Sequence, residues 1–211
     1  TAEGDSVRMV YTVPSNLFAV GNGKLRSITS NGNKSSYEWF VKNPINNYNI
    51  SVQIGNYVAV QDTLIKDSVV HYMDHYVLDY NEELASNYFP QSKEVIRFYE
   101  KYFGDYQWYE DGYKLIEVPY LGMEHQSAVT YGNGFSIYNG VRSSSWPMYG
   151  VIDPLIIHET GHEWFGNSVT ASDPTHIWIH EGLQVYSESI YFEDKFGSYE
   201  VGIHYLNSIK N

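Results

Sequence analysis

The sequence predicts an α+β fold, in which an antiparallel β segment is followed by a helical lobe that carries an HExxH motif. Strand-like runs separated by Gly and Asn turns fill residues 1–66, helical periodicity begins after about Asp67, and the motif occupies residues 158–162. Runs of strands followed by helices are typical of α+β proteins, whereas α/β proteins alternate the two. With 211 residues the chain can bury a substantial core. We therefore expect two parts, residues 1–66 and residues 67–211.

The first part has the pattern of consecutive strands. Residues 7–13 partly alternate before Pro14 stops them, and residues 18–20 and 25–28 flank Gly21-Asn22-Gly23 as the strands of a hairpin would. A further turn is expected at 31–33, and further strands at 37–41, 50–54 and 57–60. This part should be antiparallel, and it carries no catalytic constellation.

After Asp67 the periodicity changes. One more strand is expected over 71–79, and residues 82–103 have a helical pattern that Pro90 divides into two pieces, because proline lacks an N–H and clashes with the preceding turn. A strand at 113–118 and a loop at 143–147 follow. Two further helices then carry most of the predicted site.

The run HETGH at 158–162 predicts a metal site on the first of these helices. Residues four apart share a helix face, so His158 and His162 can both bind one ion, while Glu159 can take a proton from a zinc-bound water. Asp153 can cap this helix, Pro154 can occupy its first position and a glycine at 166 can end it. The alternative is a metal-free helix whose histidines are merely buried and hydrogen-bonded.

Glu181 is the expected third ligand. It follows His162 after eighteen intervening residues, on a second helix expected from Trp178 to Phe196 and ending before Gly197. A three-histidine site would need a histidine at position 168, where the chain has serine. Two histidines and one carboxylate leave zinc an open fourth position, as catalytic sites require. Glu188 either accepts a hydrogen bond from a ligand or is a solvated carboxylate.

Composition limits the partners. The chain has 13 Lys and Arg against 25 Asp and Glu, a formal charge of −12, which argues against nucleic acid and anionic membranes because both favour clustered cations. It has no cysteine, so neither disulfides nor thiolate metal sites form. No apolar run has the length of a membrane span, and no signal-like segment opens the chain. The sequence does not indicate a cellular compartment.

Three blocks resemble the zinc aminopeptidases related to aminopeptidase N and leukotriene hydrolase. The first is HETGHEWFGNSVT at 158–170, the second is WIHEG at 178–182, close to that family's WLNEG, and the third is GMEH at 122–125, similar to its GxMEN. The resemblance implies a thermolysin-like, or zincin, catalytic lobe of the gluzincin type in residues 67–211. It also implies that residues 1–66 are the C-terminal strands of an N-terminal β domain.

The resemblance also implies roles for individual residues. His158, His162 and Glu181 would bind one zinc ion, and Glu159 would be the general base. Glu124 would bind the free α-ammonium group of a peptide substrate. Gly122 and Met123 would lie along the substrate backbone and pair with it as an added strand. The implied activity is hydrolysis that removes N-terminal residues from peptides.

Two departures from the family pattern qualify this interpretation. The family's Asn is His125 here, and its preceding Gly is Leu121. In addition, the tyrosine that stabilises the oxyanion in the family would fall, by its spacing, after Asn211, and a second ammonium-binding residue would precede Thr1. We therefore expect a truncated catalytic domain whose activity on its own is low.

Two other functions stay open at this stage. A zincin-like lobe can serve as a catalytically silent binding or scaffold module, which would hold no stoichiometric zinc. A zinc endopeptidase would use the same metal ligands, but Glu124 would then be incidental and peptides with a blocked N-terminus would be cleaved.

Overall fold

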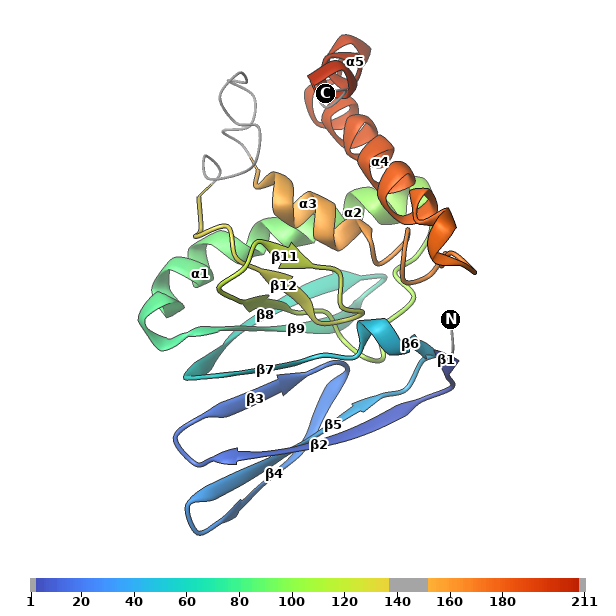
Figure 1. The fold of residues 1–211 in the computed structure, drawn as a ribbon. Helices are drawn as coiled ribbons and strands as arrows, with labels where there is room; N and C mark the ends of the chain where they lie inside the picture. The colour runs from blue at the N-terminus through green and yellow to red at the C-terminus, as the bar shows by residue number, and fades with distance from the viewer. Residues whose placement is uncertain (1–2, 137–151, 209–211) are drawn as a thin grey trace.

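The computed structural model describes residues 3–136 and 152–208 (Figure 1). The loop expected at 143–147 lies outside the described residues. Within the described ranges the chain forms small antiparallel sheets at its N-terminal end, a five-stranded mixed sheet in the middle, and helices on the far side of that sheet. This layering confirms a mixed helix and strand fold with antiparallel sheets.

The N-terminal strands form three small sheets. One has the order β2-β5-β4, one pairs β3 with β7, and one pairs β1 with β6. All of these pairs are antiparallel, as expected. The strands are β1 (Glu3–Gly4), β2 (Val7–Pro14), β3 (Phe18–Gly21), β4 (Lys24–Asn31), β5 (Lys34–Val41), β6 (Ile45–Asn46) and β7 (Val52–Gly55). The short 3-10 helix η1 (Asn47–Asn49) lies between β6 and β7.

One expected hairpin is wrong, because β3 and β4 follow each other in the chain but pair with β7 and β5 instead. Gly23 explains the change of partner. Its φ is +75°, and a Cβ at this position would lie 2.1 Å from the carbonyl oxygen of Phe40, so the chain turns tightly against β5. The turn expected at 31–33 does join β4 to β5, with Asn31 opposite Lys34.

The central sheet has the order β11-β12-β10-β9-β8. Its strands are β8 (Tyr57–Lys66), β9 (Val69–Leu78), β10 (Leu115–Glu117), β11 (Gly122–Met123) and β12 (Val129–Tyr131). β10 runs parallel to both β9 and β12, while the other pairs are antiparallel. Between β9 and β10 the chain crosses over through two helices, the kind of connection that parallel neighbours need.

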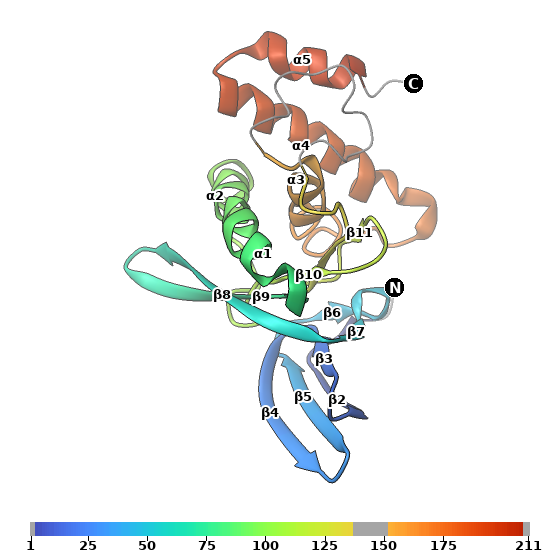
Figure 2. The ribbon, with the colours of Figure 1, turned by 90° about the vertical axis from the view of Figure 1, so that its left-hand side faces the viewer.

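The helices lie together on one face of the central sheet, and the N-terminal strands lie against its other face (Figures 1 and 2). They are α1 (Glu82–Tyr88), α2 (Ser92–Phe103), α3 (Pro154–Gly161), α4 (Trp178–Phe196) and α5 (Tyr199–Ser208). The 3-10 turn η3 (Phe89–Gln91) separates α1 from α2 at Pro90, as expected. α4 has both of its expected bounds, with Gly197 in the left-handed conformation after it. α5 was not anticipated from the sequence.

The expected end of α3 is wrong. The helix stops at Gly161 rather than near Gly166, and the chain then turns tightly, with the Glu163 N–H bonded to the Thr160 carbonyl and the Trp164 N–H to the Gly161 carbonyl. Gly166 instead belongs to this turn region, with a φ of +137°. His162 directly follows the helix and still has helical dihedral angles.

Two hydrophobic cores lie on the two faces of the central sheet. The larger packs the sheet against the helices, and the smaller packs the N-terminal strands against Tyr76, Ile116 and Ala128. The expected boundary between residues 66 and 67 lies at the turn of the β8–β9 hairpin, where Lys66 pairs with Val69. The division of the chain into two domains at this position stays a prediction. Among the described residues, no helix is both long and apolar enough to cross a membrane.

Candidate metal centre

Two histidines on and just after α3 direct the same ring atom toward one point. The Asp153 side chain accepts a hydrogen bond from the Leu155 N–H and caps the helix that carries His158. The Nδ1 of His158 lies 2.6 Å from a carboxylate oxygen of Glu188, and the Nδ1 of His162 lies 2.8 Å from the carbonyl oxygen of Phe165. Because both partners are acceptors, both Nδ1 atoms carry hydrogen.

The two Nε2 atoms therefore face each other as acceptors, 3.2 Å apart. Two lone pairs at this distance repel unless a proton or a metal cation lies between them. Burial opposes a charge on His158, but the hydrogen bond and the negative charge of Glu188 outweigh it and raise the pKa of His158 to about 9. Burial lowers the pKa of His162 to about 3. A cation between the two Nε2 atoms would remove this repulsion.

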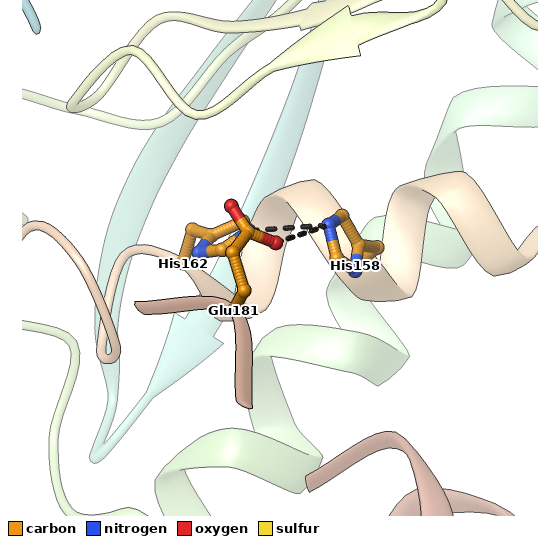
Figure 3. A group of neighbouring side chains, drawn as sticks. All are labelled: His158, His162 and Glu181. Atoms are coloured by element: carbon orange, nitrogen blue, oxygen red, sulfur yellow. Dashed lines mark hydrogen bonds and ion pairs between the residues drawn. The ribbon is translucent and has the colours of Figure 1, made fainter. Parts of the chain in front are cut away.

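Glu181 completes the donor set (Figure 3). Its Oε2 lies 3.6 Å from the Nε2 of His158 and 3.7 Å from the Nε2 of His162. A tetrahedral ion with bonds of about 2.0–2.2 Å separates its ligand atoms by roughly 3.3–3.6 Å, so the three donors fit zinc in both type and spacing. The structure thus brings together the three residues for which the sequence predicts zinc binding.

Close packing between helices holds Glu181 at this position. It lies in the first turn of α4, and α4 approaches α3 at Gly161. A Cβ on Gly161 would lie 2.1 Å from the hydroxyl of Tyr99 and 2.2 Å from the side-chain oxygen of Gln184. The separation of the two helices that carry the donors therefore depends on a residue without a side chain.

Glu159 is buried beside the donor set. Its side chain, together with those of Glu124 and His162, offers ligand-type atoms that all lie within 4.8 Å of one another. Burial raises the pKa of Glu159 to about 8, and the charges of Glu124 and Glu181 add to this while His158 opposes it. A carboxylate with a pKa near neutrality is suited to accept and return protons.

The segment 122–124 lies against Glu159. A Cβ on Gly122 would be 2.7 Å from Oε1 of Glu159, so only glycine leaves this carboxylate in place. Gly122 and Met123 form β11, which pairs with β12 and is an edge of the central sheet. Among the described residues, no further strand pairs with the outer edge of β11. Glu124 follows directly and is only 8% exposed, and burial raises its pKa.

Two residues near the site were missed or left open by the sequence analysis. Tyr48, in η1, stacks on His180 with ring centroids 6.2 Å apart. Burial raises the pKa of Tyr48, and the charges of Glu124, Glu163 and Glu181 raise it further. No local signal marks a residue so distant in sequence. Glu188 is 4% exposed, which decides between the two alternatives in favour of an acceptor to His158.

The sequence model of the Peptidase family M1 domain matches residues 88–211, more than half of the chain. The chain belongs to peptidase family M1. This confirms the family resemblance that the three sequence blocks carry.

Curated relatives of this M1 chain are much longer than it is. Endoplasmic reticulum aminopeptidase 2 of Homo sapiens is 31% identical over 119 residues, which cover 55% of this chain and 12% of that protein. Aminopeptidase M1-C of Oryza sativa subsp. japonica is 22% identical over 204 residues, which cover 95% of this chain and 23% of that protein. The M1 chain therefore spans less than a quarter of these two relatives.

Solved structures share the fold of this M1 chain. An M1 zinc metallopeptidase from Deinococcus radiodurans superposes with a TM-score of 0.71 at 18% identity, over 90% of this chain and 40% of that one. A mutant of a Deinococcus radiodurans M1 zinc metallopeptidase, solved with a Tyr-Ser-Ala substrate bound, gives a TM-score of 0.67 at 17% identity, over 90% of this chain and 41% of that one.

Proposed function

We propose that this chain is the zinc-binding part of a metallo-aminopeptidase that removes N-terminal residues from peptides. His158, His162 and Glu181 are the proposed ligands of one zinc ion in a zincin-like lobe. The observation that carries the proposal is the convergence of two Nε2 atoms and one carboxylate oxygen, 3.2 to 3.7 Å apart, beside the buried Glu159. Membership of family M1 and the fold shared with zinc metallopeptidases support it.

The chemistry follows from the donor set and its neighbours. When bound, zinc polarises the scissile carbonyl and lowers the pKa of a water molecule toward about 7. Glu159 accepts a proton from the attacking water and returns it to the leaving amine. Its buried position beside the donor set suits both transfers. Glu188 and the Phe165 carbonyl hold the two imidazoles in the required tautomer.

Glu124 determines which peptides are accepted in this proposal. Its carboxylate lies beside Glu159 and His162, directly after the edge strand β11. A peptide that pairs with β11 brings its N-terminal end close to this carboxylate, and a free ammonium group would neutralise it. A blocked N-terminus leaves the buried Glu124 charge unpaired, which is unfavourable. The Deinococcus radiodurans neighbour that holds a tripeptide supports peptide as the substrate class.

The decisive experiment compares free-amine peptides with their N-acetylated forms in the protein that contains this chain. We expect one zinc per chain, cleavage of the free-amine peptides, at least tenfold slower cleavage of the acetylated ones, and loss of activity in Glu159→Gln with zinc retained. Equal cleavage of both peptides would instead indicate an endopeptidase. Absence of stoichiometric zinc in both the wild-type protein and His162→Ala would indicate a scaffold module.

A further inference from the structure

The loop between β11 and β12, residues 124–128, carries Glu124 and contains one strained residue, Ser127. The N–H, carbonyl and hydroxyl groups of Ser127 all form hydrogen bonds. Ser127 is not glycine, yet its φ is +59°. Its N–H donates to Oε1 of Glu163 at 2.7 Å, its hydroxyl accepts from the Gly23 N–H at 2.9 Å, and its carbonyl accepts from Nζ of Lys114 at 2.7 Å. Backbone strain of this kind persists only where the surroundings fix the residue from several directions.

A second contact fixes the same loop at Glu124 itself. Asn167 is buried, and its Nδ2 donates to the carbonyl oxygen of Glu124 at 2.9 Å and to Oε2 of Glu163 at 3.1 Å. Its Oδ1 accepts from Nδ2 of Asn49 at 2.6 Å. Glu163 and Asn167 both follow His162 in the turn after α3, so this turn holds the loop at 124 and at 127.

The N-terminal strands hold the loop from the other side. Nδ2 of Asn22, which is fully buried, donates to the Gln126 carbonyl at 2.7 Å and to the Asn49 carbonyl at 2.9 Å. Its Oδ1 accepts from the Ser51 N–H at 2.8 Å. The Asn22 amide group thus joins the loop, at Gln126, to residues 49 and 51 of the N-terminal part of the chain.

We infer that Asn167, Glu163, Asn22 and Asn49 are positioning residues that set the Glu124 carboxylate at its distance from the metal donors. This inference rests on the proposed function of Glu124. The four side chains bond to the loop or to each other, and their bonds reach its backbone at residues 124, 126 and 127. The backbone that carries Glu124 is therefore held from two sides, by the turn after α3 and by the N-terminal strands. The N-terminal strands therefore contribute to recognition of the substrate's N-terminus without touching the substrate.

The test uses two variants of Asn167 and one matched control. Asn167→Ala removes all of its side-chain hydrogen bonds. Asn167→Asp keeps the shape and the acceptor for Asn49, but removes the donor to the Glu124 carbonyl and to Glu163. Asn46→Ala is the control, because Asn46 is an equally buried amide that bonds to Glu3 and Thr170 and not to the loop. Each protein is assayed for zinc content, for KM and kcat on free-amine and N-acetylated peptides, and for amide hydrogen exchange in residues 122–130.

For both Asn167 variants we expect a KM for free-amine peptides roughly 10- to 100-fold higher, a nearly unchanged rate on acetylated peptides, full zinc content and faster exchange in the loop. Asn46→Ala should change none of these. Equal losses on both peptides, or unchanged exchange in the loop, would overturn the inference. If the wild-type protein does not discriminate between the peptides, the proposed function fails instead, while the exchange data still show whether the contacts fix the loop.

Discussion

At the scale of single residues, the site depends on the absence of a side chain at Gly122 as well as on the three metal-donor side chains. Helical spacing predicted that His158 and His162 would share one face, and Glu181 was the expected third ligand because a second predicted helix carries it. The proximity of Gly122 to Glu159 was not accessible in that way. It results from a strand edge and a helix that meet in three dimensions, and the resemblance to a known motif implied only that Gly122 would lie along the substrate backbone.

Gly122→Ala should therefore impair the base without affecting the metal. A Cβ would lie 2.7 to 3.1 Å from three atoms of the Glu159 side chain, so the carboxylate must move. A displacement approaching 1 Å in a reacting group lowers rates by up to about 100-fold, and we expect kcat to fall roughly 10- to 100-fold with zinc content unchanged. Steady-state kinetics and metal analysis measure this. Gly4→Ala, a strand glycine whose Cβ would meet only ordinary contacts from 3.5 Å, is the control and should match wild type.

At the scale of elements, local sequence signals predicted where helices begin and end better than they predicted which strands pair. The Asp153 cap, the break at Pro90 and the stop at Gly197 are chemical features of a few adjacent residues, and the structure has all three. The pairing of β3 with β7 rather than β4 depends on contacts across more than 30 residues, which no local pattern contains. The amide bonds from Asn22 to Gln126 and from Asn49 to Asn167 span 104 and 118 residues and were equally inaccessible.

The close contact between α3 and α4 at Gly161 leads to a second prediction. In Gly161→Ala the new methyl group would overlap the Tyr99 hydroxyl and the Gln184 side chain, so we expect a loss of about 1–3 kcal/mol in the free energy of unfolding and weaker zinc binding. Gly182→Ala in α4 is the matched control, since its Cβ would meet nothing closer than 3.9 Å. Removing a helical glycine there should add about 0.5–1 kcal/mol. Urea unfolding of both variants measures the two changes, and a loss of equal size in both would contradict this account.

At the scale of the whole molecule, the central sheet joins two cores, and one buried histidine makes its stability depend on pH. His75 is fully buried, and its Nδ1 accepts a hydrogen bond from the Leu115 N–H at 3.0 Å, so the ring is neutral. Burial lowers the pKa of His75 to about 3. In the unfolded chain the pKa of His75 is near 6.5, so His75 binds a proton there at a pH at which it stays neutral in the folded chain. The free energy of unfolding therefore falls as the pH drops below about 6.5.

Between pH 7 and pH 5 this group alone should remove about 2 kcal/mol from the free energy of unfolding. Other groups titrate in the same range, including Glu159, whose raised pKa acts in the opposite direction. The measurement is therefore the difference between the pH profiles of the wild type and His75→Asn, which keeps an acceptor near the position of Nδ1. Both are measured with a chelator present. Parallel profiles would show that His75 does not titrate across this window.

The metal centre should stabilise the whole molecule. Without a metal, the carboxylates of Glu124, Glu159, Glu181 and Glu188 crowd around two histidines. A cation that binds only the folded state adds about 4 kcal/mol at a free concentration of 1,000 times its Kd. We expect a chelator to lower the Tm by roughly 8–16 °C, zinc to restore it, and His162→Ala to melt near the chelated value with little response to either. Thermal unfolding by circular dichroism measures this. If the chelator leaves the wild-type Tm unchanged, or lowers the Tm of His162→Ala by as much as that of the wild type, this cluster does not hold the ion. Either result would favour a scaffold module over an enzyme.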